Sequence, residues 1–333
     1  MMATVRQPRR IMLGLTLVLL ALTLAAAGFG ALKLPLHILW DPQESALRAI
    51  WWQIRLPRVL LAVLVGGALA LAGCVMQGLF RNPLADPGLL GISSGAALTV
   101  GLYVVLPLTL PPLLILYAPM LAAFVGSLIV TLIIFMLSQS ASASLPRLLL
   151  VGVAINALCG AALGVLSWIS NDSQLRTMSL WSMGSLGQAQ WPTLLACASF
   201  ILPCALLAWR LAARLNLLQL GEEDAHYLGV DVRATQRLLL FASALLVAAA
   251  VAVSGIIGFV GLVVPHLMRL WLGADHRFLV PGSLLAGSML LLIADTVART
   301  AVAPAEMPVG LLTSLIGGPV FLWLLLNRGG HRG

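Results

Sequence analysis

Acidic side chains are rare in this sequence, and four of the eleven lie close together. They fall in the segment LQLGEEDAHYLGVDVR, residues 218–233, as Glu222, Glu223, Asp224 and Asp231. Carboxylates in the first turn interact favourably with the positive N-terminal end of a helix. Asn216 or Gly221 could begin such a helix and Gly229 could end it. The block therefore predicts a short polar helix, which is either a capped, solvated loop or a docking surface for a partner.

Asp295 is an ionisable residue inside an apolar run, LLLIADTVART. Such a residue is a functional candidate by default in a membrane protein. Arg299 follows four positions later, so the two side chains can pair along one helix face. We favour this structural ion pair over a proton relay. A relay in an ion-coupled carrier would lie near the membrane midplane, whereas Asp295 is close to the predicted outer edge.

His266 and the four cysteines could bind metal, but their surroundings favour structural roles. His266 could ligate haem iron, yet it directly follows Pro265, and we expect its imidazole to hydrogen-bond backbone freed by that proline. The cysteines lie in apolar runs, where thiols behave as small hydrophobes; they are Cys74, Cys159, Cys197 and Cys204. The sequence therefore predicts neither a disulfide nor a metal site.

The sequence contains no motif for nucleotide hydrolysis. A phosphate-binding loop of the form GxxxxGK[ST] requires a lysine, and the single lysine, Lys33, lies in ALKLPL without that glycine framework. An HExxH motif is also absent, and the GxSxG match GISSG at 91–95 lies in a predicted apolar span rather than at a strand-to-helix nucleophile turn. The chain is therefore not predicted to be an enzyme, and any ATP-driven step must come from another polypeptide.

The composition indicates a polytopic membrane protein made of helices. The chain has 333 residues, of which 61% are hydrophobic and 9% charged, and its mean hydropathy is +1.04. Soluble domains carry about 25% charged residues, whereas a membrane-crossing helix needs about 20 apolar residues. We expect about ten spans, at 11–31, 57–80, 91–108, 113–138, 147–169, 192–212, 235–255, 257–271, 279–299 and 309–327.

Positive charge predicts the orientation of these spans. With the N-terminus inside, thirteen of the nineteen basic residues fall in cytoplasmic segments, as the positive-inside rule requires. Both termini and the loop 214–233 are then cytoplasmic. The net charge of +8 follows from this topology and gives no reason to expect nucleic-acid binding.

Four stretches of the chain resemble FecCD-type permeases, the membrane subunits of ATP-binding-cassette importers for iron-siderophores, haem and cobalamin. They begin RLPRVLLAVLVGGALALAG, LLQLGEEDAHYLGV, SGIIGFVGLVVPHLMR and ADTVARTAVAPAEMPVG, and lie at 55–97, 217–230, 254–283 and 294–325. The resemblance extends from about residue 50 to the end. It implies one all-α permease domain over 1–333, with the type II importer fold, that forms a homodimer in the bacterial inner membrane.

The same resemblance implies partners and a coupling site. In this family the loop between spans six and seven enters a cleft on a separate ATPase dimer, which binds ATP and Mg²⁺. Residues 214–233 would contain the coupling helices, with Gly221, Glu222, Glu223, Asp224, Ala225 and Gly229 at the contact. No cofactor is implied for this chain itself.

On the outer side, the resemblance implies docking of a periplasmic substrate-binding protein. Arg55 and Arg58 in RLPR, together with Arg299, match arginines that receive acidic residues from its two lobes. Electrostatic pairing of this kind orients partners and speeds their encounter. The alternative for Arg55 and Arg58 is anchoring of the helix to lipid headgroups.

The family's transport pathway is lined by the fifth and tenth spans, with an inner gate just before the fifth. The corresponding residues are Ser144 and Leu145, although Leu145 and Pro146 depart from the small polar residues of relatives. Arg176 could meet a carboxylate of the cargo, or it could be an ordinary charge beside the membrane.

Haem is the expected cargo. The similarity to haem importers is strongest over DSQLRTMSLWSMGSLGQAQW, residues 172–191, and the apolar lining suits haem better than a heavily charged chelate. A ferric siderophore or cobalamin remains an alternative, and an ion-coupled secondary transporter is a second alternative.

Overall fold

The computed structural model describes residues 8–29, 45–106, 111–139, 145–302 and 305–328, and the regular elements within these ranges are all helical. Seven helical segments are long and apolar enough to cross a membrane. They are α1 (Pro8–Gly28), α2 (Ser45–Ile50) continued by the π-helical turn η2 (Trp51–Arg55) and α3 (Leu56–Leu79), α5 (Pro112–Ser138), α6 (Leu145–Ile169), α8 (Trp191–Arg210), α11 (Val232–Ser254) and α13 (His276–Ala298).

Three further helices coincide with the remaining predicted spans: α4 (Ile92–Val105), α12 (Val260–Leu272) and α14 (Val309–Arg328). In α4, in α12 and in Val309–Trp323 of α14, the apolar stretch that the structure describes is shorter than a full crossing. Length and composition therefore support seven crossings, and the number ten stays a prediction. Short elements connect the longer ones: the 3-10 turn η3 (Pro87–Leu90), α7 (Asp172–Ser182), α9 (Ala212–Leu218) and α10 (Glu222–Tyr227).

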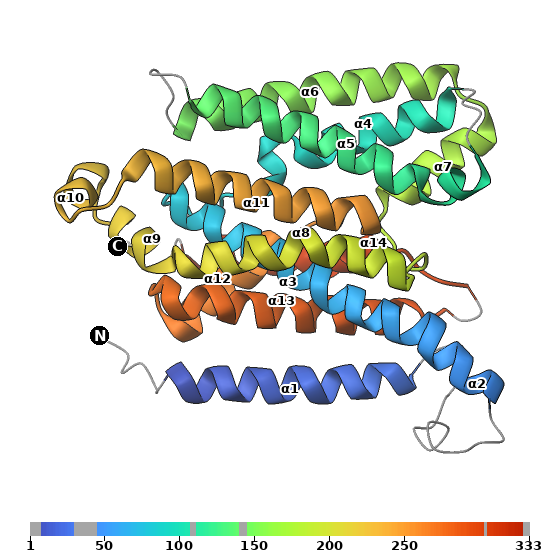
Figure 1. The fold of residues 1–333 in the computed structure, drawn as a ribbon, viewed down its shortest axis with the longest axis horizontal. Coiled ribbons are helices and arrows are strands. Elements are labelled where there is room, and N and C mark those ends of the chain that lie inside the picture. The colour runs from blue at the N-terminus through green and yellow to red at the C-terminus, as the bar shows by residue number, and fades with distance from the viewer. Residues whose placement is uncertain (1–7, 30–44, 107–110, 140–144, 303–304, 329–333) are drawn as a thin grey trace.

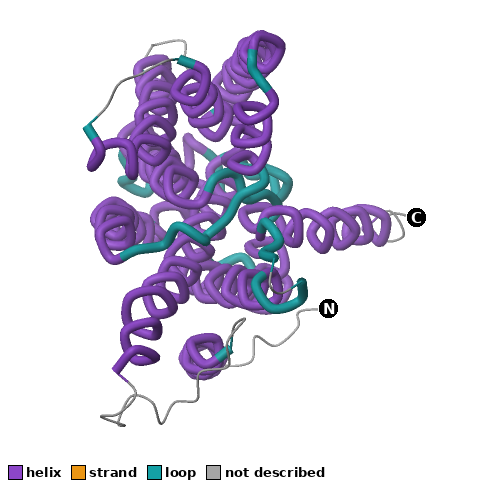
Figure 2. The backbone as a smooth tube through the Cα atoms, turned by 90° about the vertical axis from the view of Figure 1, so that its right-hand side faces the viewer, coloured by secondary structure: helices purple, strands orange, loops and turns teal. Residues whose placement is uncertain are grey.

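The long helices form a bundle around α3 (Figure 1). Helices α4, α5 and α6 lie on one side of α3, and α13 and α1 lie on the other. The short helix α10 is at one end of the bundle, where α1 also begins, whereas α2 and α7 are at the opposite end. The last helix, α14, projects away from the bundle (Figure 2). The two predicted functional regions are thus at opposite ends of the molecule.

Small residues make α3 the central helix. A Cβ atom added to Gly66 would overlap the carbonyl oxygen of Gly287 in α13, and one added to Gly73 would overlap that of Gly261 in α12. Small residues at such faces let helix backbones approach closely in membranes. The hydroxyl of Ser288 also donates to the carbonyl oxygen of Val63 at 2.7 Å. Helices α3 and α13 therefore form one closely packed pair, here called the α3–α13 pair.

We expect Gly66→Ala to destabilise the protein, because a methyl group would separate α3 from α13. Overpacking of this kind typically costs about 1–3 kcal/mol. Gly160→Ala on α6 is the matched control, since nothing lies within 4 Å of its added Cβ, and alanine favours a helix over glycine. Thermal unfolding in detergent should show a lower midpoint for Gly66→Ala alone. Equal midpoints for the two variants would contradict the close packing.

Candidate functional site

The acidic segment, residues 218–233, contains the short helix α10, which follows α9 at one end of the bundle (Figure 1). Helix α10 is preceded by Gly221, at φ 136°, and followed by Gly229, at φ 84°. Both backbone conformations strongly favour glycine. The predicted short helix is therefore present, with its expected boundaries at Gly221 and Gly229. Asn216, the alternative start, lies inside α9 instead.

Helix α10 presents an anionic and apolar surface. Its first turn carries Glu222, Glu223 and Asp224, all exposed, and Gln236 donates to Glu222 Oε1 at 2.9 Å. Exposed apolar side chains flank these carboxylates: Leu220, Tyr227 and Leu228. The exposed surface of α10 therefore combines carboxylates with apolar side chains, and its role as a docking surface stays a prediction.

Buried contacts attach α10 to the rest of the helix bundle. The side chain of Ala225 is fully buried, and its carbonyl oxygen accepts from the backbone N–H of Val230 at 3.0 Å. Leu215 and Leu218 of α9 are buried in the core as well. These contacts make the α9–α10 segment a rigid protrusion.

At the opposite end, Arg58 is the centre of a buried charge cluster. Its Nε lies 3.1 and 3.2 Å from the two carboxylate oxygens of Asp295, and its Nη2 lies 2.9 Å from Asp295 Oδ1. Its Nη1 lies 2.9 Å from both carboxylate oxygens of Glu306. Asp295 is fully buried, whereas the Glu306 side chain is 49% exposed. One arginine thus joins α3, α13 and the segment that leads into α14.

The predicted pair of Asp295 with Arg299 is present, but it is the weaker contact. Arg299 Nε lies 3.5 Å from Asp295 Oδ2, a longer distance than any of those to Arg58. Arg299 could be predicted from the sequence as a partner of Asp295, because residues four positions apart lie on the same face of a helix. Arg58 precedes Asp295 by 237 residues, so only the tertiary fold brings it there.

Arg55 and Arg299 both hold the end of α1. Arg55 Nη1 donates to the carbonyl oxygen of Gly28 at 3.0 Å, and Arg299 Nη2 donates to that of Ala26 at 2.7 Å. The last carbonyl groups of a helix lack intrahelical partners and carry partial negative charge. The structure thus brings the three predicted docking arginines together, but each is more than 90% buried and engaged within the chain. This burial does not fit the alternative that Arg55 and Arg58 anchor a helix to headgroups.

The remaining predicted residues do not form a single site. Arg176 lies exposed on α7, a helix that the span analysis missed although Asn171 and Gln174 form a capping box at its start. Leu145 begins α6, and Ser144 lies outside the described residues. His266 is buried inside α12. Among the described residues, no three potential metal-ligating side chains lie together, and the four cysteines are buried free thiols.

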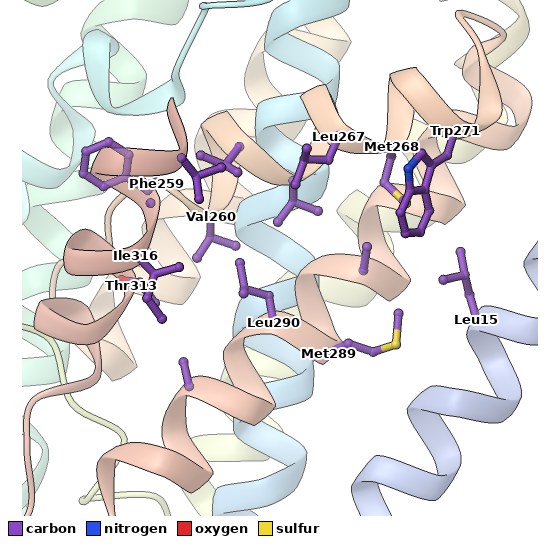
Figure 3. A pocket seen from close by; sticks show the side chains of 16 residues that line it. Leu15, Phe259, Val260, Leu267, Met268, Trp271, Met289, Leu290, Thr313 and Ile316 are labelled. Atoms are coloured by element: carbon purple, nitrogen blue, oxygen red, sulfur yellow. The ribbon is translucent and has the colours of Figure 1, made fainter. Parts of the chain in front are cut away.

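An apolar groove of about 340 Å³ lies between α1, α12, α13 and α14. Figure 3 shows Phe259 at one end and Trp271 at the other. Thr313 is the polar side chain of the lining, and its hydroxyl donates to the carbonyl oxygen of Gly310 at 3.0 Å. The lining residues therefore carry no charged side chain.

We expect Asp295→Ala to destabilise the protein strongly, because it leaves the buried Arg58 side chain without its main counter-charge. Breaking a buried ion pair from one side typically costs about 3–5 kcal/mol. Replacing both partners, with Arg58→Met and Asp295→Leu, should cost less than Asp295→Ala alone. Thermal unfolding measures both variants, with Asp172→Asn on the exposed start of α7 as the control. A loss for the double variant equal to the sum of the losses of Arg58→Met and Asp295→Leu, each measured singly, would contradict the pairing.

Comparison with known proteins identifies the family. The model of the FecCD transport family matches residues 15–327. The chain is 64% identical to the hemin transport system permease protein HmuU of Yersinia pestis, over 97% of each chain. It is 41% identical to the vitamin B12 import system permease protein BtuC of Klebsiella pneumoniae, over 98% of this chain and 96% of that one. A solved metal-chelate type ABC transporter in an inward-facing conformation matches with a TM-score of 0.86 at 35% identity, covering 96% of this chain and 99% of the other. The chain therefore belongs to the FecCD transport family of ABC importer permeases.

Proposed function

We propose that this chain is the membrane subunit of an ATP-driven importer that moves haem from a periplasmic binding protein across the bacterial inner membrane. The observation that carries the proposal is the 64% identity to a hemin transport permease over 97% of both chains. Two copies of the chain would form the membrane part of the complex. An ATPase dimer would lie on the cytoplasmic side.

In this proposal α10 is the contact for the ATPase. Its exposed carboxylates and apolar side chains provide the surface, and Gly221, Ala225 and Gly229 fix its shape. A rigid helix moves as a unit, whereas a flexible loop would absorb a displacement. ATP and Mg²⁺ would be bound by the ATPase, because this sequence lacks a phosphate-binding loop. Residues 214–233 thus act as coupling helices inside one domain of residues 1–333.

The charge cluster at the other end is the proposed contact for the binding protein. It holds three arginines against two carboxylates, Asp295 and Glu306, which leaves an excess of positive charge. Acidic residues on a binding protein would be steered to this end. Because Arg58 is occupied by Glu306, close docking requires that half-exposed carboxylate to move aside or to share the arginine.

The same orientation places both termini in the cytoplasm. Helix α1 begins at the end of the bundle that carries α10 (Figure 1), and Arg9 and Arg10 lie exposed in its first turn. Basic residues at this end agree with the positive-inside rule.

We assign the transport pathway to the faces of α6 and α14 in the dimer. Both helices leave large apolar side chains exposed, among them Leu158 and Trp168 on α6 and Leu315 and Trp323 on α14. Leu145 and Ser144 stay predicted inner gate residues, and Arg176 a predicted outer contact for the cargo.

Two alternatives to haem import by an ATP-driven complex are a different cargo and a different energy source. Cobalamin is the second candidate cargo, because a vitamin B12 permease is 41% identical over nearly the whole chain, and a ferric siderophore belongs to the same class. The ion-coupled carrier is disfavoured, because Asp295 is held by Arg58 and Arg299 at one end of the bundle rather than near the midplane.

Uptake by the reconstituted complex tests the function. We expect vesicles that contain the permease, its ATPase and its binding protein to accumulate haem only when ATP is supplied. Cobalamin and a ferric siderophore, offered in parallel, should be taken up more slowly. Uptake by the permease alone along an ion gradient would contradict the importer, and faster uptake of another cargo would contradict the assignment of haem.

A further inference from the structure

The carboxamide of Asn216 in α9 joins that helix to the start of α13. Its Nδ2 donates to Asp275 Oδ1 at 2.6 Å, and its Oδ1 accepts from the backbone N–H of His276 at 2.8 Å. The His276 ring Nδ1 lies at 2.8 Å from the same oxygen. Asp275 is the N-cap of α13 and His276 is its first residue. One side chain therefore holds the N-terminus of α13 at two points.

A second side chain of α9 reaches α3. Gln219 Nε2 donates to the carbonyl oxygen of Gly78, in the last turn of α3, at 2.8 Å. On the other side of this contact, the imidazole of His276 packs against Gly78, because a Cβ added there would lie 2.7 Å from His276 Nε2. The segment that carries α10 is thus attached to both members of the α3–α13 pair.

The attachment to α13 is partly buried, and its carboxylate, Asp275, is ionised in the physiological pH range. His276 is 2% exposed. Hydrogen bonds from Arg277 lower the pKa of Asp275 to about 2, and the Asn216 amide adds to this effect. The carboxylate therefore stays ionised and able to accept from Asn216 at any pH above that value.

The α3–α13 pair continues from this point to the other end of the bundle. There Asp295 of α13 is held by Arg58 of α3 at 2.9 Å. Between the two ends, Gly66 and Gly287 bring the backbones together. A displacement applied to the N-terminus of α13 would thus reach the buried charge cluster along one closely packed helix pair, in which α13 contains an internal proline, Pro281.

We propose that Asn216 is the positioning residue that transmits movement of α10 to α13. The proposal deepens the function proposed above and rests on it. A carboxamide that contacts both the cap residue and the first backbone N–H fixes the direction of α13 as well as its position. A methyl group in its place would keep α9 folded but leave α13 free to lag behind α10.

The sequence continues from α10 directly into α11, and this is the competing route. Gln236 of α11 donates to Glu222 of α10 at 2.9 Å, and Asp231 caps α11 through the backbone N–H of Ala234 at 2.9 Å. If movement passed through α11 alone, Asn216 would contribute to stability but not to coupling. Its variants distinguish the two routes.

The test uses the complete reconstituted complex and measures haem transported per ATP hydrolysed. We expect Asn216→Ala to assemble with the ATPase and to hydrolyse ATP, but to transport at least about fivefold less haem per ATP, the lower end of typical coupling between sites. Asn216→Asp keeps the shape but loses the Nδ2 donor and faces Asp275, so it should be uncoupled in the same way. This isosteric variant decides the outcome if Asn216→Ala does not fold.

Two controls separate coupling from stability and from docking. Asn171→Ala removes a helix cap at the opposite end and should leave transport per ATP unchanged. Replacing Glu222, Glu223 and Asp224 by Gln, Gln and Asn should weaken assembly instead, which is a test of the proposed docking surface. Wild-type transport per ATP in both Asn216 variants would overturn the role of Asn216 while leaving the importer intact. Absence of ATP-dependent uptake by the wild-type complex would overturn both proposals.

Discussion

The close approach of α3 and α13 is the constraint on which the rest of the structure depends. Glycine at positions 66 and 287 removes the side chains that would separate the two backbones, so packing of backbone atoms replaces the hydrophobic effect, which lipid does not supply between helices. The pair reaches from one end of the bundle to the other. Both candidate sites are attached to it, one at each end.

The two ends use different chemistry for their attachment. At the end with α10, neutral amides of Asn216 and Gln219 bind a helix N-terminus and a helix C-terminus. At the other end, Arg58 is held by Asp295 and Glu306. A buried ion pair is costly to break, and it is therefore suited to holding α3, α13 and the segment before α14 together at this end. Amide hydrogen bonds add geometric precision without placing an unpaired charge in the apolar interior.

Much of the fold could be predicted from hydropathy and local chemistry. The ten apolar runs coincide with ten helices, and Gly221 and Gly229 correctly marked the ends of α10. A search for apolar runs missed α7, because this helix is short and begins with polar residues. The capping box formed by Asn171 and Gln174 is the signal that could have marked its start. The partners of Arg58 and Asn216 could not be predicted, since they lie 237 and about 60 residues away in the chain. The burial of the three arginines was also missed, because an arginine at the end of a span is equally compatible with water, lipid headgroups or a buried carbonyl.

A distance measurement within one permease copy tests most directly whether the α3–α13 pair moves as one body with α10. Spin labels at Ala213, in the α9 helix that carries α10, and at Thr300, just beyond α13, would both lie at exposed positions. Labelled copies are diluted with unlabelled ones so that most dimers contain a single labelled chain. Double electron–electron resonance then reports the distance between the two labels inside that chain. We expect the same distance in the nucleotide-free and the ATP-bound complex. A shift of several ångströms, about the scale of a one-turn displacement between elements, would contradict it.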